Sequence, residues 1–133
     1  MHGELTPFEL EVAEAMTACR DSALRLCSVL SEGVAGYEGG VAIVSSGRAL
    51  DILATQAASS VRRRTSKAIS EFELSQHRFR LALIAVAMDG GLSSRQIGEA
   101  FGFSRQLASK YIKEAREKWP EVESNRGGQK SRA

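Results

Sequence analysis

Residues 92–120 read LSSRQIGEAFGFSRQLASKYIKEAREKWP, and they contain the most specific structural pattern of the chain. Near its start, Ser93 is followed three residues later by Gln96, which is the pattern of a capping box. The box predicts a short helix over about 94–101. Gly102 comes directly after this helix and permits the left-handed backbone in which many helices end. The stretch therefore begins with a helix of about two turns that stops abruptly.

A second helix is expected after a turn of three or four residues. Ser104 can cap it, and the predicted helix covers 105–118. Pro120 then prevents the helix from continuing, because proline lacks the amide hydrogen that the helix needs. Two short helices joined by a glycine-containing turn form a helix-turn-helix, here at about 93–119.

The apolar residues of this segment agree with two helices that pack on each other. Those expected on the inner side are Ile97, Phe101, Phe103, Ala108, Tyr111 and Ile112. Gly98 is expected where the two helices approach most closely. We expect any larger side chain there to force the helices apart, at a cost of about 1–3 kcal/mol.

The outward side chains of the second helix are of the types that read DNA. Arginine can bind guanine O6 and N7 together, glutamine can pair with adenine, and serine or lysine can serve bases or phosphates. In a helix-turn-helix the second helix contacts base edges, and the first crosses the phosphate backbone. The expected DNA-binding residues are therefore Ser94, Arg95 and Gln96 on the first helix, and Ser104, Arg105, Gln106, Ser109, Lys110 and Lys113 at the second.

Residues 74–119, LSQHRFRLALIAVAMDGGLSSRQIGEAFGFSRQLASKYIKEAREKW, resemble the helix-turn-helix domain of sigma factor region 4 and of response-regulator-type regulators. The shared features are an apolar helix ending in Gly-Gly-Leu-Ser, the run RQIGEAFGFSRQ, and the closing KEAREKW. The resemblance implies that Arg105 and the outward residues after it belong to a recognition helix. Gly98 and Ala108 depart from the family, which usually has Ala and Val or Ile there. Nothing upstream resembles sigma region 2, so the resemblance does not imply a sigma factor.

The rest of the chain also predicts helices, which makes the fold class all-α: a helical N-terminal arm plus a trihelical or tetrahelical core. Thr6 to Glu9 form a second capping box, with proline at the first helical position, and this helix is expected to end near Gly33. Its apolar residues recur with a 3.5-residue period, as in a coiled coil. They are the dimerisation candidates Val12, Met16, Cys19, Ala23, Leu26 and Leu30. Packing within their own domain is the alternative interpretation.

Further elements follow along the chain. Five glycines within 33–47 predict a connector, in which residues 41–44 form a short strand or an apolar loop. A helix is expected over 48–64, ending in arginines that suit a helix C-terminus or contact phosphates, namely Arg62, Arg63 and Arg64. Another is expected over 66–88, stopped by Asp89-Gly90-Gly91.

The predicted organisation has three parts. Residues 1–64 form a helical region that braces or dimerises, 65–120 form the helix-turn-helix domain, and 121–133 form a polar, disordered tail. Residues 1–60 hold three Lys or Arg against eight Asp or Glu, whereas 61–133 hold fifteen against eight. This charge asymmetry favours a polyanion as the partner of the C-terminal part.

The sequence argues against an enzyme, a cofactor and a metal site. His2 and His77 are isolated, and no paired carboxylates, nucleophile motif or metal-ligand spacing is evident. Cys19 and Cys27 are expected to be free thiols packed as small apolar side chains in a reducing compartment. With no signal peptide and no apolar run longer than 81–88, the chain is expected to be soluble and cytoplasmic, without a membrane partner.

The sequence therefore predicts a transcriptional regulator that binds double-stranded DNA as a homodimer, with the transcription machinery as a further candidate partner. Two alternatives stay open. One is a helical adaptor that binds RNA polymerase, a sigma factor or a phage protein, and the other is an accessory protein of DNA recombination.

Overall fold

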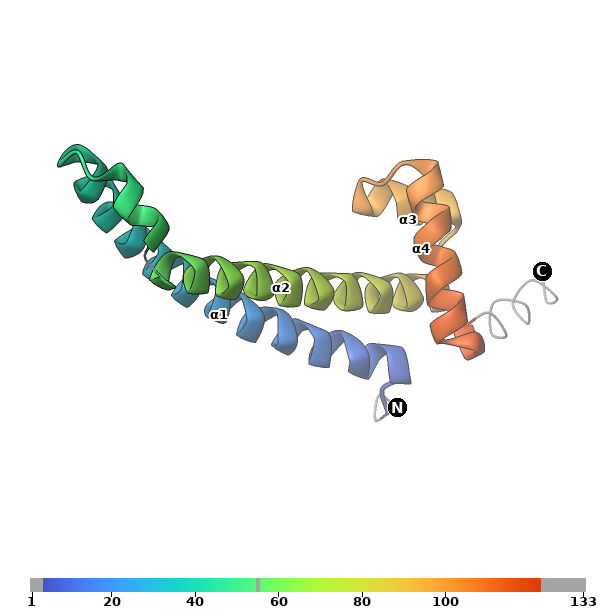
Figure 1. Ribbon diagram of the computed structural model, residues 1–133. Helices are drawn as coiled ribbons and strands as arrows, with labels where there is room; N and C mark the ends of the chain where they lie inside the picture. The colour runs from blue at the N-terminus through green and yellow to red at the C-terminus, as the bar shows by residue number, and fades with distance from the viewer. Residues whose placement is uncertain (1–3, 55, 123–133) are drawn as a thin grey trace. The chain divides into compact units, whose positions relative to one another are not determined.

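The computed structural model describes residues 4–54 and 56–122, and over these residues it is helical without strands, which confirms the all-α class. Figure 1 shows the order of the elements. They are α1 (Pro7–Ser45), the 3-10 helix η1 (Ala49–Ala54), α2 (Gln56–Asp89), α3 (Ser94–Phe101) and α4 (Arg105–Lys118). No helix in the described part of the chain is both long and apolar enough to cross a membrane.

Helix α1 begins at the predicted capping box but is much longer than predicted. The amide of Thr6 donates to Glu9 Oε1 at 2.9 Å, and the amide of Glu9 donates to Thr6 Oγ1 at 3.1 Å. The helix then passes Gly33 and continues to Ser45, so the predicted connector at 33–47 and the strand option at 41–44 are wrong. A glycine inside a helix costs about 1 kcal/mol but still makes the backbone hydrogen bonds, so glycine alone does not end the helix.

The end of α1 is set by Gly47. This residue has a φ of 81°, which is left-handed backbone that residues with a side chain rarely adopt. Its amide bonds the carbonyl of Val44 at 3.0 Å, and the amide of Arg48 bonds the carbonyl of Ile43 at 3.1 Å. These two bonds form a Schellman motif, which satisfies the last carbonyls of the helix.

Helix α2 replaces the two helices predicted over 48–64 and 66–88. Residues 49–54 form η1, and α2 then runs unbroken through the expected break at residue 65. No glycine or proline occurs within α2, so no residue interrupts its hydrogen bonds. It ends where predicted, at Asp89, followed by a second Schellman motif in which Leu92 bonds the carbonyl of Ala87 at 3.1 Å.

The chain divides into two compact units. The core unit comprises residues 1–17 and 76–133, and the hairpin unit comprises residues 18–75. Both long helices contribute to both units, so the domain boundary expected at residue 64 falls inside α2. The first turns of α1, which the sequence assigned to a separate region, belong to the same unit as α3 and α4.

The core unit is built around one apolar cluster. Its buried members are Phe8 from α1, Leu81, Ala82, Ile84, Ala85 and Met88 from α2, Ile97 from α3, Ile112 and Ala115 from α4, and Trp119 and Val122 beyond it. The rings of Phe8 and Trp119 meet edge to face, with centroids 6.5 Å apart. Val122 is fully buried, so the disordered tail expected from residue 121 is wrong for residue 122. Residues 123–133, which carry the rest of that prediction, lie outside the described part of the chain.

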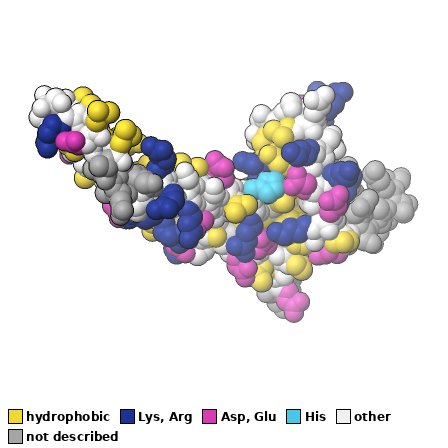
Figure 2. Space-filling model, in the orientation of Figure 1, with side chains coloured by type: hydrophobic (Ala, Val, Ile, Leu, Met, Phe, Trp, Pro, Cys, Tyr) yellow, Lys and Arg dark blue, Asp and Glu magenta, His cyan; other side chains and the backbone are white. Residues whose placement is uncertain are grey.

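The hairpin unit pairs α1 with α2 in opposite directions. Ser22, which is buried, donates from Oγ to Ser75 Oγ at 3.3 Å, and Arg25 pairs with Glu71 at 3.4 Å. A Cβ atom added to Gly33 would lie 3.8 Å from Val61, so the two backbones are close there. Figure 2 shows hydrophobic side chains exposed over the end of this hairpin, where α1 leads into η1.

Four of the six residues in the predicted apolar seam of α1 are half-buried, namely Val12, Cys19, Ala23 and Leu26. Met16 and Leu30 are instead 54% and 48% exposed. Ala15 is buried in place of its neighbour Met16, and Ser22 is buried beside the half-buried Ala23. Of the two free cysteines, Cys19 is half-buried and Cys27 is exposed, so the expected packing fails for Cys27.

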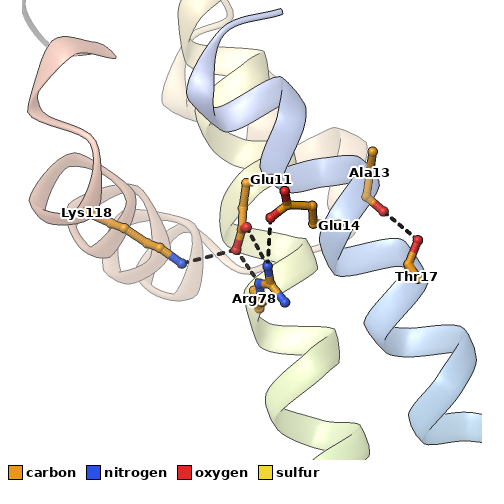
Figure 3. A network of polar contacts seen from close by, with 6 residues as sticks. All are labelled: Glu11, Ala13, Glu14, Thr17, Arg78 and Lys118. Atoms are coloured by element: carbon orange, nitrogen blue, oxygen red, sulfur yellow. Dashed lines mark hydrogen bonds and ion pairs between the residues drawn. The ribbon is translucent and has the colours of Figure 1, made fainter.

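A network of charged side chains ties three helices of the core unit together (Figure 3). The carboxylate of Glu11 accepts hydrogen bonds from Nε and Nη2 of Arg78, the latter at 2.7 Å, and from Nζ of Lys118 at 3.4 Å. Glu14 also accepts from Arg78, at 3.4 Å. The hydrogen bonds from Arg78 lower the pKa of Glu11 below its ordinary value of 4.5, although burial opposes them.

We predict that the Glu11→Gln substitution lowers the free energy of unfolding by about 1–2 kcal/mol at neutral pH, because it removes a charge-assisted two-bond pair. A carboxyl whose pKa is lowered in the folded state stabilises it above the unfolded pKa, and the effect disappears as the pH falls through the folded pKa. Urea unfolding gives the free energy of unfolding of the natural protein and of the variant, and the difference between the two should therefore shrink below pH 4.5. Glu117→Gln, at an exposed position on α4, is the control. An unchanged difference at acid pH would contradict the prediction.

Candidate nucleic-acid interface

Helix α3 has the predicted bounds because its capping box forms. Ser93 has extended backbone, and its Oγ accepts from the amide of Gln96 at 3.2 Å. The side chain of Gln96 returns to the amide of Ser93, which donates to Oε1 at 2.8 Å. These bonds satisfy two amides that have no partner within the helix. The start of α3 is therefore fixed to a single residue.

The turn between α3 and α4 is equally well determined. Gly102 has a φ of 71°, and the amide of Phe103 bonds the carbonyl of Gly98 at 2.9 Å, which gives a third Schellman motif. Ser104 then caps α4, its Oγ accepting from the amide of Leu107 at 3.2 Å. Two hydrogen-bonded caps thus fix the points at which α3 ends and α4 begins.

Aromatic rings from the end of α3, from the turn and from α4 lie beside an arginine of α2. The rings of Phe101 and Phe103 stack with centroids 5.3 Å apart, and Phe103 lies 5.2 Å from Tyr111. The guanidinium of Arg80 lies 5.2 Å from the Tyr111 ring and donates to the Tyr111 hydroxyl at 3.3 Å. The sequence analysis did not identify Arg80. Its position four residues before the buried Ile84, on the same helix face, is the signal that could have found it.

His77, which is half-buried, meets Glu114 of α4, with 2.9 Å between Nε2 and Oε2. It also lies beside Tyr111, with ring centroids 5.5 Å apart. Glu114 is therefore engaged on the side of α4 that faces α2, away from the exposed residues at the start of α4.

From Arg105 to Lys113, the exposed face of α4 presents polar side chains without a carboxylate, and Glu117 is the first acidic residue on this face, one turn further along. Five predicted DNA-binding residues are exposed there, namely Arg105, Gln106, Ser109, Lys110 and Lys113. A helix turns by about 100° per residue, so these five occupy an arc of about 140° that contains none of the buried residues of α4. Figure 2 shows Lys and Arg side chains over the surface of α3 and α4.

The cations of this face differ from seven of the twelve other Lys and Arg residues in the described part of the chain. Within residues 4–54 and 56–122, seven basic side chains pair with a carboxylate: Arg20, Arg25, Arg48, Arg64, Arg78, Arg95 and Lys118. Among the same residues, Arg105, Lys110 and Lys113 form no ion pair. Their charge is therefore available to an external anion.

The start of α3 supplies the second group of predicted contacts. Ser94, Arg95 and Gln96 are all exposed. Arg95 pairs with Glu99 at 3.0 Å, but its side chain is 85% exposed, and such a pair contributes little in water. An arriving phosphate can therefore displace Glu99 from Arg95 at small cost.

The remaining predicted contacts lie in the other unit. Arg62, Arg63 and Arg64 are exposed on α2 within the hairpin unit, and Arg64 pairs there with Glu32. Helices α3 and α4 belong instead to the core unit. No group of three or more His, Cys, Asp or Glu in the described part of the chain is placed to hold a metal ion.

The environment of Gly98 gives a prediction about the packing of α3 on α4. An added Cβ would lie 3.5 Å from both Ala108 Cβ and the carbonyl oxygen of Phe103, which are ordinary contact distances. The expectation that any larger side chain forces the helices apart is thus too strict for alanine. Gly98→Ala should raise the free energy of unfolding by about 0.5–1 kcal/mol, because alanine favours the helix.

Gly98→Leu should instead lower the free energy of unfolding by about 1–3 kcal/mol, because its larger side chain overpacks the space beside Ala108. Urea unfolding of both variants checks the pair. Equal destabilisation by alanine and leucine would show that the two helices pack more closely than described.

No protein-family model matches the chain, and no curated protein or solved structure matches it significantly. The functional argument therefore depends on the residues and on their geometry.

Proposed function

We propose that this protein is a sequence-specific, DNA-binding transcriptional regulator whose α3 and α4 act as a helix-turn-helix. The observation that carries the proposal is the exposed face of α4, where Arg105, Lys110 and Lys113 have no ion pair within the described residues. A charge that pairs within the protein contributes to its fold. An exposed charge without a partner stays hydrated and remains free to bind an external anion.

The dimensions of α4 suit the major groove. An α-helix with its side chains is about 10–12 Å in diameter. The major groove of B-form DNA is about 12 Å wide and admits one helix. The exposed polar residues lie in the N-terminal part of α4, where the positive end of the helix dipole favours an anion.

Each side chain can then be given a role. Arg105 and Gln106, in the first turn of α4, are placed to read guanine and adenine respectively. Lys110 and Lys113 lie further along, where phosphates flank the groove. Ser94, Arg95 and Gln96 would contact the backbone on the other side, with the α3 N-terminus contributing its dipole.

A single helix-turn-helix buries little DNA surface, so we expect the protein to act as two copies on half-sites about 34 Å apart. Such a regulator would work in the cytoplasm beside the transcription machinery.

Fluorescence anisotropy with genomic DNA fragments tests the proposal. Affinity should fall by about 100-fold when salt rises fourfold, if four phosphates are neutralised. Arg105→Ala should cost about 1–3 kcal/mol and relax the preference at one base pair. Lys113→Ala should weaken binding to all DNA sequences alike. It should also reduce the slope of log affinity against log salt concentration by about one.

Arg20→Ala, which removes the same charge from an arginine paired with Asp21, is the matched control and should leave affinity unchanged. Absence of binding at low salt, or equal effects of Arg105→Ala and Arg20→Ala, would refute the proposal.

A further inference from the structure

The part of α1 in the hairpin unit carries an exposed apolar stripe that folding leaves uncovered. Its five side chains are 48–80% exposed: Leu30, Val34, Tyr37, Val41 and Val44. Their spacings are 4, 3, 4 and 3 residues, so they occupy an arc of about 80° on the helix. Five large apolar side chains in one row exceed the scattered hydrophobic residues of an ordinary surface.

The stripe lies beside the face that α1 turns toward α2. That inner face contains Ser22, which bonds Ser75, and Gly33, which lies against Val61. Because α2 occupies the inner face, it leaves the stripe uncovered.

The charge around the stripe limits what can bind to it. Residues 30–44 contain two glutamates, Glu32 and Glu38, and no Asp, Lys or Arg. Glu32 is paired with Arg64. With no basic residue, the stripe suits neither nucleic acid nor an anionic membrane surface. Residues 123–133 have Ala133 as their only hydrophobic residue, so they cannot cover it either.

We propose that the stripe is the interface with a second copy of this chain, formed by α1 pairing with α1. A 3.5-residue apolar period is the pattern by which helices pair with one another in coiled coils. Charges that would select a foreign partner are absent from the stripe, and two nearly uncharged surfaces do not repel. Twofold pairing of identical surfaces is also the commonest form of oligomer.

This inference deepens the proposed function, because it locates the contact that would bring two DNA-reading helices together. It also replaces the predicted dimerisation seam, of which Val12 packs against the core-unit cluster and only Leu30 belongs to the stripe.

Sedimentation equilibrium of the full chain over a range of concentrations tests the interface. The natural protein should have twice the chain mass, and Val41→Glu or Tyr37→Glu should raise the dissociation constant at least about tenfold, because each buries a charge in place of an apolar side chain. Leu24→Glu is the matched control. Leu24 is 63% exposed, close to the 65% of Val41, but lies on another face of α1, so this variant should stay dimeric.

All variants change exposed residues, and circular dichroism should show unchanged helix content. A natural protein that is monomeric at every concentration, or that is dimeric only with a foreign protein, would overturn the inference. Equal effects of Val41→Glu and Leu24→Glu would do the same. DNA affinity is measured separately, so a dimer that fails to bind DNA refutes the proposed function alone, and a monomer that binds DNA refutes this interface alone.

Discussion

The exposed face of α4 depends on the burial of one isoleucine in α3. Helix α3 has only eight residues, whereas isolated helices shorter than about 12–15 residues are marginal in water. Ile97 is fully buried in the cluster that also contains Met88 of α2 and Ile112 of α4. Burial of such a side chain contributes about 1.5–3 kcal/mol, enough to hold a short helix whose ends are already capped. Through the turn at Gly102, this packing sets where α4 begins.

The elements that the sequence predicted well are those fixed by local interactions. The bounds of α3 and α4 follow from Ser93, Gly102 and Ser104, each of which acts on backbone within a few residues of itself. The five polar residues of α4 were also correctly expected to be exposed, because the buried residues Ala108, Ile112 and Ala115 mark the opposite side of the helix.

The features that the sequence did not predict depend on distant parts of the chain. Whether Ala15 or Met16 is buried depends on the angle at which α2 crosses α1. The spacing of apolar residues along α1 does not determine that angle. The contact of Phe8 with Trp119 joins residues at opposite ends of the sequence. The length of α1 was predicted wrongly for another reason. Gly33 and Gly47 are both glycines that could end a helix, but of the two only Gly47 adopts the left-handed backbone.

The capping of the two short helices has a consequence for hydrogen-bond polarity. Oε1 of Gln96 already accepts from Ser93, which leaves one of its two lone pairs and both amide hydrogens for an outside partner. The Oγ atoms of Ser93 and Ser104 likewise accept from backbone amides, which directs their hydroxyl hydrogens elsewhere. The starts of α3 and α4 are therefore rich in hydrogen-bond donors that complement phosphate oxygens. Gln96 therefore has less acceptor capacity for the two-bond pairing with adenine than Gln106.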